Sequence, residues 1–343
     1  MALTMWETRN IEKMVQRALI RERGKIEGNQ KFSQYLHARD HLEEILDQIR
    51  ATQPTLTDHS LRHVMEVLDN AESLLGTESE LKKSFSGTDL YCLALSILFH
   101  DVGNVFNREE HQHKVAEVYD YIRPDQERYR QEKWIILKAV EAHCGEAMDG
   151  SKDTLKLLHD QTALERKPVK LRQIAAILRL ADELAEGPQR TSLFMQQQHF
   201  YPADSQIFHQ YSNITSIHID RRNERIALTY NIKIDTEDQI TLSTEKEQEL
   251  LELLRFTYDR IFKLDQERQY AKHYCQILSP FKATTVSINF WIDKRPYELG
   301  LLTLVLNDLV VPGDSHRELH EINTAYRREN IISKIHDFFQ SRH

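Results

Sequence analysis

The sequence has few cysteines and lacks any long apolar segment. Its three cysteines (Cys92, Cys144 and Cys275) are odd in number and far apart in the 343-residue chain, and no CxxC motif accompanies them. This argues against a disulfide framework and a structural zinc knuckle, so we expect a reducing, cytoplasmic setting. No apolar run approaches the ~20 residues of a membrane helix, and the first residues do not resemble a secretory signal, so we expect no membrane partner.

Basic residues are also fewer than acidic residues. Lysine and arginine total 45 against 53 acidic residues, which leaves a formal net charge of -8. This argues against a broad surface for duplex nucleic acid, which needs a basic footprint. A small anionic ligand stays compatible, because a bound cation can reverse the local sign inside an acidic protein. The chain also lacks a glycine-rich phosphate loop, an internal repeat and an evident serine or cysteine triad.

Helical periodicity dominates the first part of the chain. Apolar residues recur at helical spacing over residues 1–53, with a break around Gly24 and Gly28, and Pro54 ends this arm. The apolar stripe of the arm needs a partner, which is either a second copy of the chain or the following helices; we expect a homo-oligomer.

Further helices are predicted up to residue 190. Thr57 or Asp58 caps a helix that Gly76 closes, and Asp89 caps a helix that ends at His100–Asp101, before Gly103. Three more are expected at 109–122, 131–145 and 171–184. We therefore expect residues 1–190 to be entirely helical.

The pattern changes near residue 212. Alternating apolar residues at 214–219 and 226–232 predict a β-hairpin, a long helix follows at 245–272, and residues 284–292 are typical of a strand. Helices beyond residue 315 close the chain. The predicted fold class is mainly α, with an N-terminal helical arm at 1–55, a helical bundle at 56–200 and a small α+β domain at 205–343.

Polar residues occupy apolar helix faces in this bundle. His100 and Asp101 end the apolar run Leu93–Phe99, and a carboxylate buried alone costs several kcal/mol or more. Three histidines and an aspartate lie on other apolar stripes: His63, His111, His143 and Asp182. One shared cation would satisfy several of these groups together. Mixed imidazole and carboxylate ligands suit Mn²⁺, Fe²⁺, Mg²⁺, Ni²⁺ or Zn²⁺.

Each of these residues also has an interpretation that involves no metal ion. His100 and Asp101 could instead cap a helix end, and Asp182 could pair with Arg179 or Arg172. His59 lies one turn before His63 and competes with it as the ligand. His111 and His143 could be core histidines satisfied by hydrogen bonds.

The order of these residues resembles the HD superfamily of metal-dependent phosphohydrolases. The matching segments cover residues 56–192 and are His63–Val67, Phe99–Gly103, His111 with Val115–Tyr119, Val140–His143 and Ile177–Leu184. The resemblance implies that His63, His100, Asp101 and Asp182 hold one ion. In two-metal members, Asp101 would bridge to a second ion on His111 and His143; with one ion, His111 or His143 would be the general acid.

The resemblance implies hydrolysis of a phosphoester or phosphoanhydride bond in a nucleotide or nucleotide-like small molecule. Catalysis would involve Asp101, His111 and His143, and substrate contacts are expected from Arg190, His59 and Lys114. A looser similarity to HD-CE-type proteins of bacterial signalling and conflict loci includes the arm, the Thr57–His63 opening and the C-terminal domain.

The substrate stays open, because the chain departs from the best-known subfamilies. It lacks the extended HD segment of deoxynucleotide triphosphohydrolases, the additional motifs of cyclic-di-GMP phosphodiesterases and the Glu-Asp pair of (p)ppGpp hydrolases. Two other functions remain as alternatives. One is a non-catalytic nucleotide sensor in a signalling or defence system, and the other is a di-iron oxygenase.

Overall fold

The computed structural model describes residues 6–108, 111–143, 146, 150–234, 242–310 and 318–340. The chain forms two units: the first comprises Met1–Ala185 and Tyr270–Ser279, and the second comprises Glu186–Gln269 and Pro280–His343. These units differ from the domains at 1–55, 56–200 and 205–343, because the arm shares a unit with the helices after it.

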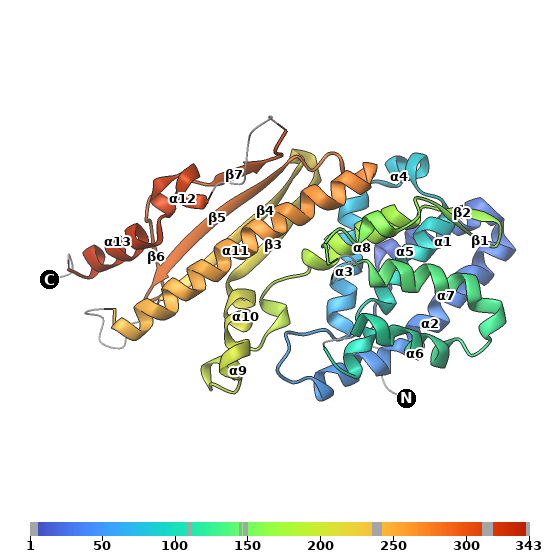
Figure 1. Ribbon diagram of the computed structural model, residues 1–343, viewed down its shortest axis with the longest axis horizontal. Coiled ribbons are helices and arrows are strands. Elements are labelled where there is room, and N and C mark those ends of the chain that lie inside the picture. Colours follow the sequence, from blue (N-terminus) through green and yellow to red (C-terminus); the bar gives the residue numbers. More distant parts are fainter. Residues whose placement is uncertain are drawn as a thin grey trace. The chain divides into compact units, whose positions relative to one another are not determined.

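The first unit is a helical bundle around one buried helix (Figure 1). All residues of this helix, α5 (Gly87–Phe99), are buried, and it contacts helices on several sides. A helix with apolar residues on every face needs other elements around it, because no face can be left to water. The surrounding α-helices are α1 (Asn10–Arg23), α2 (Lys25–Thr52), α3 (Leu61–Leu75), α4 (Glu78–Ser84), α6 (His111–Ile122), α7 (Gln126–Glu141) and α8 (Leu171–Glu183). Short 3₁₀ turns are η1 (Val102–Val105), η2 (Leu155–Leu157) and η5 (Gln276–Leu278).

The N-terminal arm packs on this bundle. Gly24, at a φ of 82°, separates α1 from α2, and the two helices contact each other and α5. A Cβ at Gly87 would lie 2.7 Å from the backbone of Ala18, so the glycine permits the close approach of α1 and α5. We expected the apolar stripe of the arm to pack either on a second copy of the chain or on the following helices. In the structure it packs on the following helices.

The helix caps correct two predictions. Ser60 precedes α3, and Asp58 accepts a hydrogen bond from its backbone nitrogen at 2.9 Å, so neither Thr57 nor Asp58 is the cap. Ser86, rather than Asp89, caps α5, and the Asp89 carboxylate completes the reciprocal capping box. Gly76 does close α3. The ends predicted at Glu109 and Gly145 lie outside the described residues.

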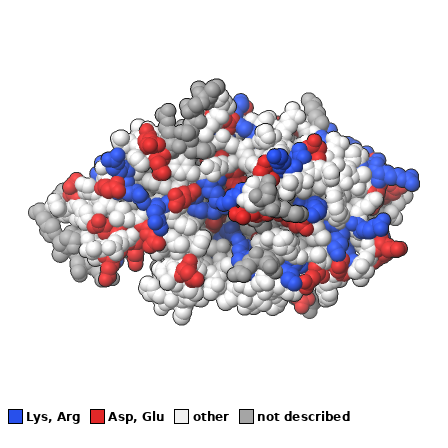
Figure 2. All heavy atoms as spheres, in the orientation of Figure 1, with Lys and Arg blue, Asp and Glu red and all other residues white. Residues whose placement is uncertain are grey.

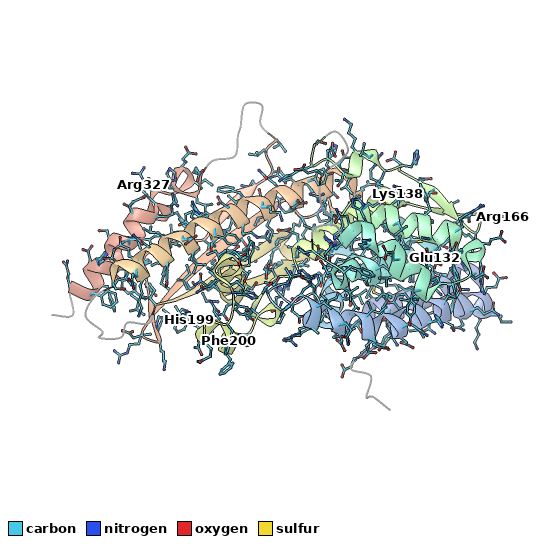
Figure 3. All side chains as sticks on the ribbon, turned by 60° about the horizontal axis from the view of Figure 1, so that its bottom comes forward. Glu132, Lys138, Arg166, His199, Phe200 and Arg327 are labelled. Carbon is cyan, nitrogen blue, oxygen red and sulfur yellow. The ribbon has the colours of Figure 1, made fainter. Side chains whose placement is uncertain are left out.

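A short β-hairpin interrupts the helical first unit, so the prediction that residues 1–190 are entirely helical is wrong there. Strands β1 (Thr162–Leu164) and β2 (Lys167–Val169) pair antiparallel. Glu165 and Arg166 form the turn with φ values of 52° and 64°, and Arg166 marks it in Figure 3. Three-residue strands with a proline and a charged turn carry too little alternation to be read from sequence.

The second unit contains a five-stranded sheet. Its strands are β3 (Thr215–Asp220), β4 (Arg225–Ile234), β5 (Ala283–Ile292), β6 (Arg295–Tyr297) and β7 (Leu304–Asn307). β3 and β4 form the predicted antiparallel hairpin, and β4 pairs in parallel with β5. The long α11 (Thr244–Tyr274) provides the crossover that a parallel pair needs. The other helices of this unit are α9 (Leu193–Gln197), α10 (Ala203–Ile214), α12 (Leu319–Ile322) and α13 (Arg328–Gln340), with 3₁₀ turns η3 (Pro188–Arg190), η4 (Arg221–Asn223) and η6 (Thr324–Tyr326).

The predicted fold class, mainly α with a small α+β region, is confirmed. Within the described ranges, no helix combines the length and the apolar character required to cross a bilayer.

Candidate metal centre

Three helices of the first unit position a group of buried His and Asp side chains. His63 lies in the first turn of α3, Asp182 lies in the last turn of α8, and His100 and Asp101 directly follow α5. Because α5 is buried throughout and ends inside the core, the two residues after it are buried as well. The sequence signal for this group was therefore the polar residue on each apolar face.

The ligand atoms of these four residues converge. His63 Nε2 lies 3.1 Å from Asp182 Oδ1, and His100 Nε2 lies 3.3 Å from Asp101 Oδ2. The two imidazole Nε2 atoms are 3.3 Å apart. One ligand atom from each residue lies within 4.8 Å of all the others, which is the spacing of a shared ion.

A second group shares Asp101. His111, at the start of α6, places Nε2 3.4 Å from Asp101 Oδ1, and His143 follows the end of α7. Asp101, His111 and His143 also have ligand atoms within 4.8 Å of one another. The other oxygen of Asp101, Oδ2, faces His63 and His100. One carboxylate therefore belongs to two adjacent sets of ligands.

The backbone orients three of the imidazoles for metal binding. The Nδ1 atom of His100 lies 2.7 Å from the carbonyl of Ile97, and that of His111 lies 3.0 Å from the carbonyl of Arg108. His143 makes the same contact with Val140. A carbonyl oxygen only accepts, so Nδ1 carries a proton and Nε2 is the ring nitrogen that faces the cluster. Hydrogen-bonded ring nitrogens of this kind are typical of metal-ligating histidines.

The electrostatics also fit a cation. Burial raises the pKa of Asp101, but the neighbouring His100 and His59 more than offset this and hold it well below its usual range. For Asp182, burial is likewise outweighed by hydrogen bonds from His100 and His63, so its pKa is lowered. Burial lowers the pKa of His100, but Asp101 and Asp182 more than offset this and hold it well above its usual range, so the two carboxylates favour a positive charge beside them, which a divalent ion would supply. The cluster can therefore bind a divalent metal ion, although its identity does not follow from these contacts.

His59 lies closer to the cluster than helical spacing indicates. Its Nδ1 is 3.0 Å from Asp101 Oδ2, the same oxygen that faces His63 and His100. His59 precedes α3 and is buried. The sequence offered it as an alternative ligand to His63, whereas in the structure the two residues are neighbours. We assign it a contact with Asp101; its role in substrate binding stays a prediction.

The two basic residues expected to contact substrate have other ion-pair partners. Lys114 lies on α6 and pairs with Glu117 at 2.7 Å. Arg190 belongs to the second unit, where Nη1 is 3.9 Å from Glu186 Oε2. Arg172 pairs with Asp160, and Arg179 donates to Thr154 Oγ1 at 3.0 Å. The alternative arginine partners considered for Asp182 are therefore engaged in other contacts.

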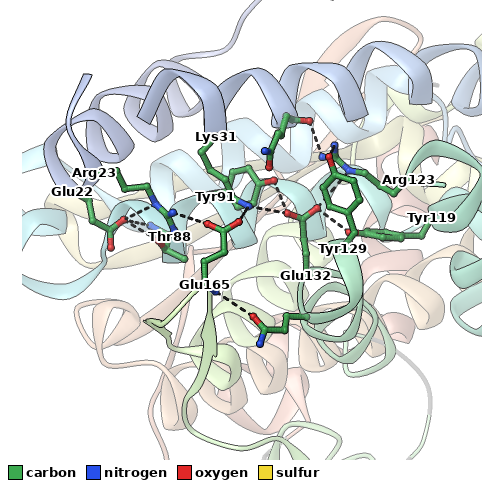
Figure 4. A network of polar contacts seen from close by, with 12 residues as sticks. Glu22, Arg23, Lys31, Thr88, Tyr91, Tyr119, Arg123, Tyr129, Glu132 and Glu165 are labelled. Carbon is green, nitrogen blue, oxygen red and sulfur yellow. Dashed lines mark hydrogen bonds and ion pairs between the residues drawn. The ribbon is translucent and has the colours of Figure 1, made fainter. Parts of the chain in front are cut away.

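A buried network centred on Glu132 joins α2, α5, α6 and α7 (Figure 4). Glu132 on α7 accepts hydrogen bonds from Tyr91 of α5 at 2.7 Å and from Tyr119 of α6 at 2.8 Å. Lys31 of α2 and Arg123 complete the ion pairs at 3.2 and 3.5 Å. Burial and the Glu132 charge raise the pKa of both tyrosines, so they remain protonated donors. The sequence analysis missed this network, because its members are scattered over four helices.

Comparison with known proteins gives one match. The family model described as HD-CE matches residues 53–263, which include every ligand of the cluster. No curated protein and no solved structure is significantly similar to the chain.

Proposed function

Because this chain belongs to the HD-CE family, we propose that it is a metal-dependent phosphohydrolase acting on a nucleotide or nucleotide-like substrate. The family match agrees with the resemblance that the ordered His and Asp residues indicated. The observation that carries the proposal is the sharing of Asp101 by two sets of converging ligands. Such a centre can hold one or two ions at one end of a bundle.

The residues would hold the metal in two adjacent sites. His63, His100, Asp101 and Asp182 form the first set, and Asp101, His111 and His143 form the second. A divalent ion bound there would lower the pKa of water and offset charge on phosphoryl oxygens. The donor set suits Mn²⁺, Fe²⁺, Mg²⁺, Ni²⁺ or Zn²⁺.

The surrounding side chains orient this set. His59 contacts the same Asp101 oxygen as the ligands do and fixes the direction of the carboxylate. Asp182 retains 26% exposure of its side chain, whereas those of His63 and His100 have none. Substrate would therefore approach on the Asp182 side. With one ion bound, a protonated Nε2 of His111 or His143 would donate a proton to the leaving oxygen.

The proposed partner is a nucleotide or nucleotide-like small molecule, with Arg190, His59 and Lys114 as candidate contacts. On the face drawn in Figure 2, basic and acidic side chains are interspersed. The absence of a duplex nucleic-acid partner and the homo-oligomeric state remain predictions.

A hydrolysis screen tests this function. The full chain is incubated with dNTPs, NTPs, cyclic nucleotides and short oligonucleotides, each with Mn²⁺, Mg²⁺, Ni²⁺, Zn²⁺ or Fe²⁺. Chromatography then identifies the bond that is cut. We expect turnover that disappears in Asp101→Asn and persists in Lys138→Ala, which removes only an exposed pair with Glu141 on α7. Equal turnover by the Asp101→Asn protein would contradict the proposal.

The same screen distinguishes the two alternatives. Tight nucleotide binding without turnover in any metal would favour a sensor. Oxygen consumption that requires iron would favour a di-iron oxygenase. Either result would replace the phosphohydrolase.

A further inference from the structure

Strand β4 of the second unit extends beyond its neighbour β3. Their antiparallel pairing starts at Thr215 and Tyr230, so residues 231–234 of β4 have no partner in β3. On the opposite edge, β5 pairs along the whole of β4, up to Ile234 and Ile292. One edge of β4 is therefore open at its end.

The direction of the backbone shows which groups face that open edge. The carbonyl of Ile234 accepts a hydrogen bond from the nitrogen of Asp293, which continues from β5. Successive strand residues point their amide and carbonyl groups to opposite sides, so Ile232 also faces β5. Asn231 and Lys233 then direct an N–H and a C=O each to the other side. Within the described ranges, no strand pairs with them there.

A cavity of about 240 Å³ lies beside this edge. It is lined by all four consecutive residues, from Asn231 to Ile234. Because side chains alternate between the two faces of a strand, a cavity that touches four in succession lies along the strand edge. Its other walls come from α9, α10, α11 and Leu242; Leu250 and Leu253 are among the α11 residues.

One polar group in the cavity wall lacks a partner. The side-chain oxygen Oε1 of Gln196 is buried and accepts no hydrogen bond from the described residues. Buried amide oxygens are normally satisfied, so a ligand that brings N–H donors would complete this wall.

We propose that the open edge of β4 binds an extended peptide of a partner protein in which apolar and acidic residues alternate. The peptide backbone would pair with Asn231 and Lys233, as in other cases of strand addition. Alternate side chains would enter the apolar space formed by Ile232, Ile234 and the leucines of α11, all of which line the cavity. The side chains between them would lie beside Lys233, which is exposed.

Charge favours a partner peptide over a second copy of this edge. Lysines on an edge strand discourage pairing between identical edges, because like charges meet. Lys233 lies on the edge itself, whereas Lys246 and Glu249, the other charged residues of the lining, lie on α11. Two copies of the edge would bring Lys233 near its own copy, whereas an acidic strand would place a carboxylate beside it.

Two short acetylated peptides test the proposal with the full chain. One alternates valine with glutamate, and the other alternates valine with lysine; each carries a fluorophore for anisotropy. We expect the acidic peptide to bind more tightly. Lys233→Glu should weaken its binding by about fivefold and strengthen binding of the lysine peptide by a similar factor. Arg222→Glu makes the same charge change at the other end of β4 and should leave both affinities unaltered.

Amide hydrogen exchange by NMR identifies the mode of binding. The acidic peptide should slow exchange at Asn231 and Lys233 but leave Ile232 and Ile234, already paired with β5, unchanged. The proposal is overturned if neither peptide binds at about 1 mM, if Lys233→Glu leaves the preference intact, or if the two amides stay unprotected. Protection of both amides in a peptide-free dimer would also overturn it, in favour of a second copy.

Discussion

Two buried polar clusters of the first unit are each built around carboxylates but differ in the side chains that face those carboxylates. Around Glu132, the tyrosine hydroxyls and the Lys31 ammonium donate to one carboxylate, so each donor meets an acceptor (Figure 4). Around Asp101, the imidazoles direct Nδ1 toward backbone carbonyls and present Nε2 to carboxylates. The two ligand sets around Asp101 therefore consist of imidazoles and carboxylates, which are metal-ligating groups, and include no lysine, arginine or tyrosine.

This difference separates a structural cluster from a binding site. Lys31 and Arg123 balance the charge of Glu132 with strongly basic side chains, whereas the two ligand sets that share Asp101 contain only His and Asp. Burial does not distinguish the two clusters, but the residue types that face their carboxylates do. Removing a member should therefore affect folding in one case and metal binding in the other.

The largest expected effect is on folding. Glu132→Ala leaves the guanidinium of Arg123 buried without its carboxylate, and we expect a loss of about 3 kcal/mol in unfolding free energy. Urea denaturation measures it. Lys138→Ala, on the same helix (Figure 3), should cost less than about 1 kcal/mol, because its pair with Glu141 is exposed. Equal losses in the two variants would contradict the structural role of Glu132.

Asp101→Asn should weaken metal binding without affecting folding. It removes the carboxylate that both ligand sets share, so we expect metal affinity and activity to fall by at least about 100-fold. Circular dichroism should show unchanged helix content. A variant that retains full metal affinity would remove the distinction between the two clusters.

His59→Ala tests whether the contact to Asp101 matters. Loss of a group that orients a metal ligand typically costs 10–100-fold, so we expect about tenfold weaker Mn²⁺ binding. Titration calorimetry measures the change. His113→Ala on α6 is the control, since the structure does not place His113 in either ligand set. Unchanged affinity in His59→Ala would show that the backbone alone fixes Asp101.

The smallest effect is expected for Tyr91→Phe. It removes one hydrogen bond to Glu132 and should cost about 1 kcal/mol of stability. Metal affinity should stay the same, because Tyr91 belongs to neither of the two ligand sets. Tyr121→Phe, at an exposed position, should change neither quantity. A Tyr91→Phe protein with weaker metal binding would show that the two clusters are coupled.

Much of the fold and the site could be predicted from residue patterns. Each of His63, His100, Asp101 and Asp182 interrupts an apolar face, and this local signal is sufficient to group them. The strands near residues 215 and 226 have the alternation of a half-buried hairpin. In both cases, the periodicity of one segment carries the information.

Other features depend on contacts between distant segments. Glu132 lies on α7, and its hydrogen-bond partners lie on α2, α5 and α6. The residue spacing within α7 does not predict which side chains of other helices these partners are. His59 lies before α3, so helical periodicity says nothing about its direction. The hairpin turn at Glu165 is held by ion pairs with Arg23 and Lys31 from the first two helices.

Metal stoichiometry tests the central claim most directly. The unaltered chain and Asp101→Asn are each loaded with Mn²⁺, Fe²⁺, Mg²⁺, Ni²⁺ or Zn²⁺, desalted and analysed for bound metal. Convergence of the imidazoles and carboxylates predicts one or two ions per unaltered chain for at least one of these metals, and their loss in the variant. An unaltered chain that retains none of them, or a variant that retains as many, would contradict the account.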